Sequence, residues 1–460
     1  MTASTQPQGV GRGAWMALTA ALLGWLFDGF EMGLFPMVAR PALKELLPDA
    51  SEADIGFWFG IVTSVFLVGA ATGGVLFGWL GDRIGRVRAM ALSVLTYAVF
   101  TGLCGMAGSG WQMGALRFIA SLGMGGEWSL GVALVMEVWP NKSRAFMAGL
   151  IGAAANVGYL LVGVVGIGLA TILKDVEIGL SDLGMTQEWV DKLVRNQGWR
   201  IMMMMGAAPA LLTFLIRLFV PESKKWEHEK ASGATSNWAT HDLIAVLVGA
   251  LGPILIIYSW AVDQDIWIRI RWSPEVVMEL PIGLGLEHGF WYRMVGSLLG
   301  LALATGGYTY PVIRYLQRLT SGDHADARPW KPILGRMLLA AGISGVALLG
   351  TWGAAQWAPT WAGKLESDQS LHPKEWTQIA AAVGAIIGTI AAALVGDWLG
   401  RRITYSLLCV LSLMSLLVLY QGNTEYGTMF LASTFLVGVC TASFYGWLPL
   451  YLPELFHTDQ

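Results

Sequence analysis

Long apolar runs separated by short polar segments make up most of the chain. A helix needs roughly 20 apolar residues to cross the ~30 Å hydrocarbon core of a bilayer. Twelve runs have about that length, and they lie at 14–38, 56–80, 88–107, 111–136, 145–173, 201–220, 243–262, 294–313, 337–361, 376–396, 403–420 and 428–451. They lack the alternation of barrel strands. Because helices satisfy their own backbone hydrogen bonds in lipid, the pattern predicts an all-α, polytopic membrane bundle.

Composition agrees with this prediction and excludes other classes of protein. Hydrophobic residues make up 55% of the chain and charged residues 13%, whereas soluble domains carry roughly 25% charged residues. The net charge of −3 implies no nucleic-acid partner. The histidines are scattered, and all three cysteines fall in apolar runs. We therefore expect no enzyme activity, no catalytic residue, no metal and no cofactor.

The distribution of basic residues predicts the orientation of the chain. With the N-terminus in the cytoplasm, the cytoplasmic segments hold more Lys and Arg than the outer segments do. This bias follows the positive-inside rule. The sequence thus predicts a multi-pass protein of the inner (plasma) membrane with a cytoplasmic N-terminus.

A charged turn with glycines follows the second run, and a related turn follows the tenth. The residues of this gating motif are Gly78, Asp82, Arg83, Gly85 and Arg86 in the first copy and Asp397, Gly400, Arg401 and Arg402 in the second. Internal repeats are typical of secondary transporters. An Asp at a helix end can bind the positive N-terminus of a neighbouring helix, so the motif could latch the cytoplasmic side. The alternative is that its arginines only set topology.

Four ionisable residues lie within the runs and are candidates for proton coupling. They are Asp28, Glu31, Arg117 and Glu127. Each costs roughly 2.5–3.5 kcal/mol to insert, which favours a functional role. Asp28 and Glu31 share a helix face, and their mutual repulsion favours uptake of a proton by one of them. Arg117 is the available counter-charge, whether in a coupling pair or in a static ion pair. Glu127 is a second proton site or a structural hydrogen-bond acceptor.

Amide and aromatic groups within the runs are the candidate substrate contacts. They are Asn156, Tyr159, Trp352, Gln356, Trp357 and Tyr445. Such groups suit sugars or sugar acids, although most tryptophans of a membrane protein lie in the interfacial belts. Arg117 is also a candidate, because it could attract a substrate carboxylate instead of serving the proton relay.

Several motifs resemble those of the major facilitator superfamily. Both charged turns match its cytoplasmic loop signature, and residues 117–127 (RFIASLGMGGE) resemble its fourth-helix signature in sugar and organic-acid symporters. Residues 221–223 (PES) resemble the motif after helix six. Residues 28–31 (DGFE) resemble the first-helix acidic motif of aromatic-acid and sialic-acid proton symporters. The resemblance implies that a first-helix acid and the fourth-helix Arg couple transport to protons.

The chain departs from the family plan in two places. Two extra runs, 243–262 and 294–313, precede the segment that resembles helix seven, as in the sialic-acid transporter subgroup. Two further helices are expected after residue 451, so we expect a C-terminally truncated sequence; the alternative is a natural twelve-helix protein. The predicted organisation is a six-helix bundle over 1–220, loops and two inserted helices over 221–336, and a four-helix bundle over 337–460.

These observations predict a monomeric, proton-driven symporter of a small organic anion working by alternating access. Sialic acid or another sugar acid is the first substrate class, and an aromatic or simple carboxylic acid or a neutral sugar is the alternative. A transporter-like nutrient sensor is the rival class, disfavoured because no soluble domain of useful size is present. A channel is also disfavoured, because duplicated gating turns suit alternating access.

Overall fold

The computed structural model describes residues 12–138, 144–208, 211, 240–261, 267–273, 276–281, 286–320 and 330–455. The first half contains α1 (Arg12–Leu46), α2 (Glu52–Ile84), α3 (Arg86–Cys104), α4 (Gly110–Val138), α5 (Arg144–Asp182) and α6 (Gln187–Met205). Next come α9 (Thr240–Ala261), β1 (Trp267–Ser273), β2 (Val276–Pro281) and α10 (Leu286–Thr320). The second half contains α11 (Trp330–Trp352), η3 (Ala355–Trp357), α12 (Ala358–Leu365), η4 (Gln369–Leu371), α13 (Pro373–Leu399), α14 (Arg401–Gly422), α15 (Thr428–Thr441), α16 (Phe444–Tyr451) and η5 (Leu452–Leu455).

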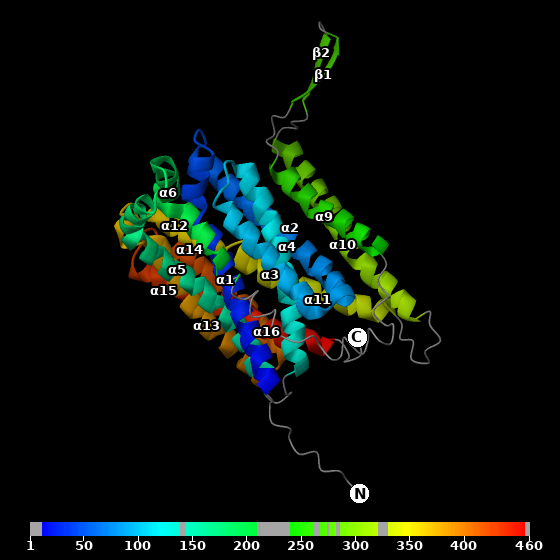
Figure 1. Ribbon diagram of the computed structural model, residues 1–460. Helices are drawn as coiled ribbons and strands as arrows, with labels where there is room; N and C mark the ends of the chain where they lie inside the picture. Colours follow the sequence, from blue (N-terminus) through cyan, green and yellow to red (C-terminus); the bar gives the residue numbers. More distant parts are fainter. Residues whose placement is uncertain are drawn as a thin grey trace.

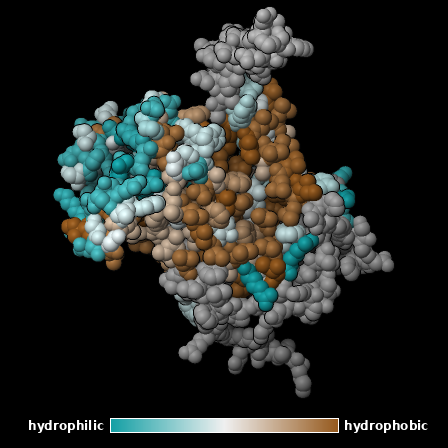
Figure 2. Space-filling view, turned by 45° about the horizontal axis from the view of Figure 1, so that its top comes forward, coloured by the Kyte–Doolittle hydropathy of each residue, from teal (hydrophilic) through white to brown (hydrophobic). Residues whose placement is uncertain are grey.

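Long apolar helices form the bundle that the sequence predicts. Within the described residues, nine helical segments are long and apolar enough to cross a membrane. Figure 2 shows a broad apolar area on one face of the molecule, with hydrophilic residues gathered to one side. The predicted all-α membrane bundle is therefore confirmed. The end that carries the turn between α1 and α2 is called the outer end below, following the orientation predicted from charge.

Glycines bring pairs of helices into close contact in both halves. A Cβ atom on Gly125 of α4 would overlap the carbonyl oxygen of Ala70 in α2, and one on Gly438 of α15 would overlap that of Ala381 in α13. Small residues of this kind allow membrane helices to pack backbone to backbone. The same device therefore joins α2 to α4 and α13 to α15, as expected for a duplicated architecture.

The two halves meet mainly where α5 packs against α13 and α16. Near the inner end, Leu18 of α1 and Met147 of α5 share an apolar cluster with Leu450 of α16. At mid-depth, Gln378 of α13 donates a hydrogen bond to the backbone oxygen of Tyr159 in α5 at 2.8 Å. These contacts hold the halves together along a shared face.

The two inserted runs are helices, α9 and α10, which lie side by side along the edge of the bundle, with α9 beside α2 (Figure 1). Of the two, α9 is among the nine segments long and apolar enough to cross a membrane, and α10 is not. A Cβ atom on Gly307 of α10 would overlap the Cα of Gly249 in α9, so the pair packs closely. The hydroxyl groups of Tyr308 in α10 and Thr72 in α2 are 3.0 Å apart. Between the two helices, β1 and β2 form an antiparallel hairpin that the apolar pattern does not predict.

Two predicted runs are interrupted helices. Residues 337–361 fall on α11, η3 and the start of α12, and residues 428–451 fall on α15 and α16. Pro359, in the first turn of α12, lacks the backbone N–H that a continuous helix would use there. Hydropathy does not register such breaks, because the interrupting residues are themselves apolar. Of the predicted run 201–220, only residues 201–208 and 211 lie among those described.

Candidate functional site

A central cavity lies between the two halves; together with the open space at its mouth it measures about 950 Å³. Helices α1 and α5 form one wall, and α11, η3, α12, α13, α15 and α16 form the other. Five of the predicted substrate contacts line it, namely Asn156, Tyr159, Trp352, Gln356 and Tyr445. The structure thus gathers polar and aromatic groups from distant parts of the chain around one space.

The polar groups of the cavity are held in pairs. The hydroxyl groups of Thr351 and Tyr445 are 2.8 Å apart. Across the two halves, the Tyr159 hydroxyl donates to Oε1 of Gln356 at 3.1 Å. The Asn156 side chain donates to a backbone oxygen of its own helix, leaving its carbonyl for other contacts. Such fixed groups in a largely apolar cavity can orient a small polar ligand.

Glu31 of α1 and Arg117 of α4 form an ion pair inside the first half. Their side chains are 1% and 3% exposed. Thr101 of α3 adds a hydrogen bond to the same glutamate oxygen at 3.1 Å. The other oxygen, Oε2, has no hydrogen-bond partner among the described residues. A buried pair of this kind is costly to break by removing one partner, so its charge state affects helix packing.

One aromatic ring separates this ion pair from the cavity. The Arg117 guanidinium lies over the ring of Phe66, 4.3 Å from its centroid. The Phe66 ring in turn packs against Trp352, a cavity residue, with centroids 5.8 Å apart. Arg117 itself does not line the cavity. A change in the Glu31–Arg117 pair can therefore reach the cavity through Phe66.

The other two candidate acids are also buried. Asp28 of α1 is 2% exposed and Glu127 of α4 is 1% exposed. Asp28 directly precedes Gly29, which lines the cavity. Both carboxyl groups are therefore removed from water, and their roles in proton coupling stay predictions.

Gln378 of α13 is a candidate that sequence reasoning missed. It is fully buried, and its Nε2 donates to Tyr159 across the two halves. Its Oε1 has no hydrogen-bond partner among the described residues. A buried acceptor left open costs roughly 1–3 kcal/mol, which makes it a candidate contact for a ligand or a water. The sequence signal that points to Gln378 is an amide within an apolar run, which indicates a functional residue less strongly than a charge does.

The duplicated turns adopt the same backbone geometry in both halves. Gly85 joins α2 to α3 with φ of 109°, and Gly400 joins α13 to α14 with φ of 85°. Gly78 lies within α2, about two helical turns before the first junction. Only glycine adopts such positive φ values without strain, so Gly85 and Gly400 are required at the two junctions.

In the second half, the charged turn forms an ionic network. Arg401 binds Glu454 at 2.6 Å and Asp397 at 3.3 Å. Glu454 follows α16, so the network joins the start of α14 to the last described turn of the chain. Arg402 is exposed.

In the first half, the guanidinium of Arg83 lies over the ring of Trp79 at 4.3 Å, and Arg86 begins α3 half-buried. The side chain of Asp82 lies outside the described part of the structure. Of the latch predicted at this turn, the structure therefore describes the arginine side chains but not the side chain of Asp82.

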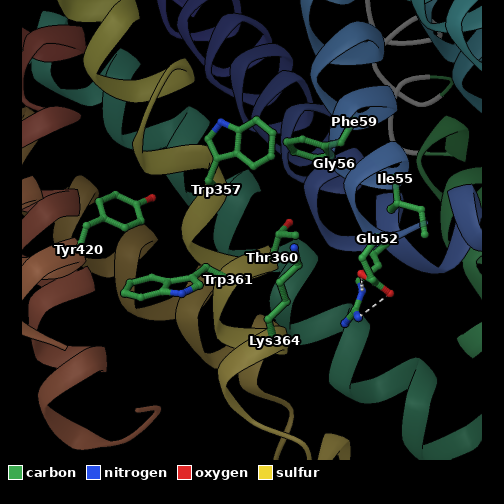
Figure 3. A pocket seen from close by; sticks show the side chains of 10 residues that line it. Glu52, Ile55, Gly56, Phe59, Trp357, Thr360, Trp361, Lys364 and Tyr420 are labelled. Atoms are coloured by element: carbon green, nitrogen blue, oxygen red, sulfur yellow. Dashed lines mark hydrogen bonds and ion pairs between the residues drawn. The ribbon is translucent and has the colours of Figure 1, made fainter. Parts of the chain in front are cut away.

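A second, outer pocket lies at the outer end of the same interface (Figure 3). Trp357 lines this outer pocket rather than the central cavity. Its ring packs edge-on against Phe59 of α2, with centroids 4.5 Å apart. The neighbouring Gln356 faces the central cavity. The neighbours Gln356 and Trp357 thus line different spaces.

A protein-family model and solved structures of other proteins agree with this architecture. A model of the Major Facilitator Superfamily matches residues 14–460, and the chain belongs to that family. Among solved structures, the xylose transporter XylE of Escherichia coli, in a partially occluded inward open conformation, shares the fold. The alignment covers 96% of this chain and 88% of that one, with a TM-score of 0.58 and 16% identity.

Two curated relatives are also similar in sequence. The chain is 31% identical over 231 residues to the cis,cis-muconate transport protein of Acinetobacter baylyi, covering 50% of this chain and 49% of that protein. It is 27% identical over 214 residues to the sialic acid transporter NanX of Escherichia coli, covering 46% and 42%. The chain spans about half the length of the curated relatives it matches. These relatives are transporters, in agreement with the expectation that the chain is not an enzyme.

Proposed function

We propose that this chain carries a small organic anion across the inner membrane together with protons. The observation that carries the proposal is the buried Glu31–Arg117 pair, which lies one aromatic ring from a cavity between the two halves. Protonation of Glu31 would release Arg117 and change the packing of α1 against α4. An ion pair that is broken and remade in this way can link proton uptake to a change of shape. The proton gradient would supply the energy.

Sugar acids such as sialic acid are the first proposed substrates, and aromatic or simple carboxylic acids the second. The names of two relatives, a muconate and a sialic acid transporter, support a carboxylate substrate. Hydroxyl and amide groups of Tyr159, Gln356 and Tyr445 could bind sugar hydroxyls, while Trp352 offers a ring face. A neutral sugar remains the alternative, because no cation lines the cavity among the described residues.

Alternating access requires a barrier on each side of the cavity. At the outer end, Trp357 packs on Phe59. At the inner end, the apolar cluster that includes Leu450 and the Arg401–Glu454 pair would serve the same purpose. We propose that rocking of the two halves opens these barriers in turn. The protein would act as a monomer with its N-terminus in the cytoplasm.

Uptake into proteoliposomes tests the proposal. For the full-length chain with one proton carried per anion, about two units of pH difference should drive roughly 100-fold accumulation. Radiolabelled sialic acid, muconate and benzoate are compared with a neutral hexose, at equal pH and with the gradient. The proposal would be refuted if the pH gradient drove the uptake of none of the three anions. A transporter-like nutrient sensor would bind one of these ligands but would not carry it into the vesicles.

Two substitutions test the cavity. Tyr445→Phe and Gln356→Leu each remove one hydrogen-bonding group, so the KM for the transported anion should rise about 5-fold, with little change in the amount of folded protein. Tyr258→Phe, at an exposed position of α9, is the matched control and should leave KM unchanged. Initial rates of uptake over a range of concentrations provide the measurement. Unaltered KM in both cavity variants would place substrate recognition elsewhere.

A further inference from the structure

The outer pocket is a compartment of its own at the outer end of the interface between the halves. Together with the open space at its mouth it measures about 720 Å³, and its walls come from α1, α2, η3, α12 and α14. The Trp357 and Phe59 rings, which are in contact, line this pocket, whereas the neighbouring Gln356 lines the central cavity. The transport proposal assigns no ligand to this pocket.

Aromatic side chains form one side of the outer pocket. The ring of Trp361 lies 5.1 Å from that of Tyr420 and 5.3 Å from that of Phe430. The Tyr420 hydroxyl donates to the backbone oxygen of Ala354 at 2.6 Å, which fixes the ring. A ligand ring can pack against such preorganised aromatic faces at low entropic cost.

Basic side chains form the other side. Arg40 and Lys44 of α1 share one partner, Glu52, at 3.0 and 2.8 Å. Lys364 of α12 is exposed and has no carboxylate partner among the described residues. In Figure 3, Lys364 and Thr360 lie between Trp361 and Glu52. Glu52 therefore neutralises part of the charge of Arg40 and Lys44, whereas the ammonium group of Lys364 is available to a bound anion.

We propose that the outer pocket is a separate binding site for small aromatic carboxylates, which it holds before the Trp357–Phe59 barrier opens. The ligand ring packs against Trp361, and its carboxylate binds Lys364 and Thr360. Gly56 leaves room for the ring, because nothing lies within 4 Å of the place its Cβ would occupy. This inference rests on the proposed function and adds a second binding step to it.

Equilibrium binding of radiolabelled benzoate to the purified full-length chain in lipid nanodiscs tests the site. Wild-type protein should bind benzoate at the outer pocket in addition to any central site. In Lys364→Gln, the affinity of the outer site should fall about 10-fold, as expected for loss of a charge-assisted hydrogen bond. Trp361→Leu should weaken it as well. Cyclohexanecarboxylate, which lacks the aromatic ring, should compete poorly there.

The matched controls are Lys192→Gln and Trp189→Leu in α6, where a lysine lies over a tryptophan ring at 4.8 Å outside the outer pocket. Both should bind benzoate as wild type does. Because Trp361 packs in an aromatic cluster, the binding result for Trp361→Leu counts only if the variant keeps the wild-type melting temperature. Lys364 is exposed, so the result for Lys364→Gln can be interpreted without this control. Wild-type protein that binds no second benzoate, or Lys364→Gln that binds as wild type does, would overturn the inference.

Transport separates this inference from the proposed function. In Lys364→Gln, uptake at low benzoate concentration should slow, while the maximal rate is retained. Loss of proton-driven uptake for every anion with intact outer binding would refute the transport proposal alone. Normal uptake with unaltered outer binding in Lys364→Gln would refute the binding site alone.

Discussion

Glu31→Gln should abolish proton-driven accumulation of the substrate while leaving exchange across the membrane in place. The substitution keeps the size of the side chain and one acceptor for Thr101, but it removes the group that can take up a proton. Accumulation under about two units of pH difference should therefore fall from roughly 100-fold to none. Exchange of labelled for unlabelled anion needs no net proton movement and should continue. Parallel assays of accumulation and counterflow in proteoliposomes provide the measurement.

The variant also leaves Arg117 buried without its counter-charge, a change that costs about 3–5 kcal/mol in comparable buried pairs. The double variant Glu31→Gln with Arg117→Gln relieves this cost, so it should regain thermal stability without regaining accumulation. Glu188→Gln, at an exposed position in α6, should behave as wild type. Persistent accumulation in Glu31→Gln would remove Glu31 from the coupling mechanism, and Glu127→Gln would then be the next variant to examine.

Gly125→Leu and Gly438→Leu should each prevent the chain from folding into a stable bundle. A side chain at either position would occupy the space of a backbone carbonyl oxygen, Ala70 for the first and Ala381 for the second. The facing helix cannot rotate such an atom away, so the cost should reach at least the upper end of overpacking, about 3 kcal/mol. Size-exclusion profiles and melting temperatures of the detergent-solubilised protein would report the loss.

Gly342→Leu in α11 is the matched control, because nothing lies within 4 Å of the place that a Cβ at this position would occupy. It adds the same apolar group to a helix of the same kind and should retain the wild-type profile. A folded, monodisperse Gly125→Leu variant would show that α2 and α4 pack less closely than described. Equal damage in both halves is expected from their shared design, since each variant blocks the same type of helix contact.

Hydropathy and repeated turns predict most of the fold. A run of about 20 apolar residues has few alternatives in a membrane, so the helices and the inserted pair followed directly. The break at residues 355–357 and the hairpin at 267–281 did not follow. The break depends on local backbone geometry among apolar residues, and the hairpin lies between two apolar runs, where hydropathy specifies no element.

The charged residues of the candidate site can be predicted from the sequence, because a charge within an apolar run is costly to insert into a membrane. Glu31 and Arg117 stood out because few charged residues occur within apolar runs, and the structure places them in contact. Gln378 did not stand out, because an amide changes mean hydropathy little and its importance depends on a contact with α5. The sequence pattern places Trp357 with Gln356 among the substrate contacts, whereas the turn of η3 directs these neighbours into different spaces.

The short segment η3 thereby contributes adjacent residues to two separate chambers, the central cavity and the outer pocket. Gln356 contributes to the inner chamber and Trp357 to the outer one, although they are adjacent in the chain. A mutation that shifts this backbone must alter both chambers at once. Evolution could therefore not retune the preference of one without some effect on the other, and substitutions around η3 should be strongly epistatic.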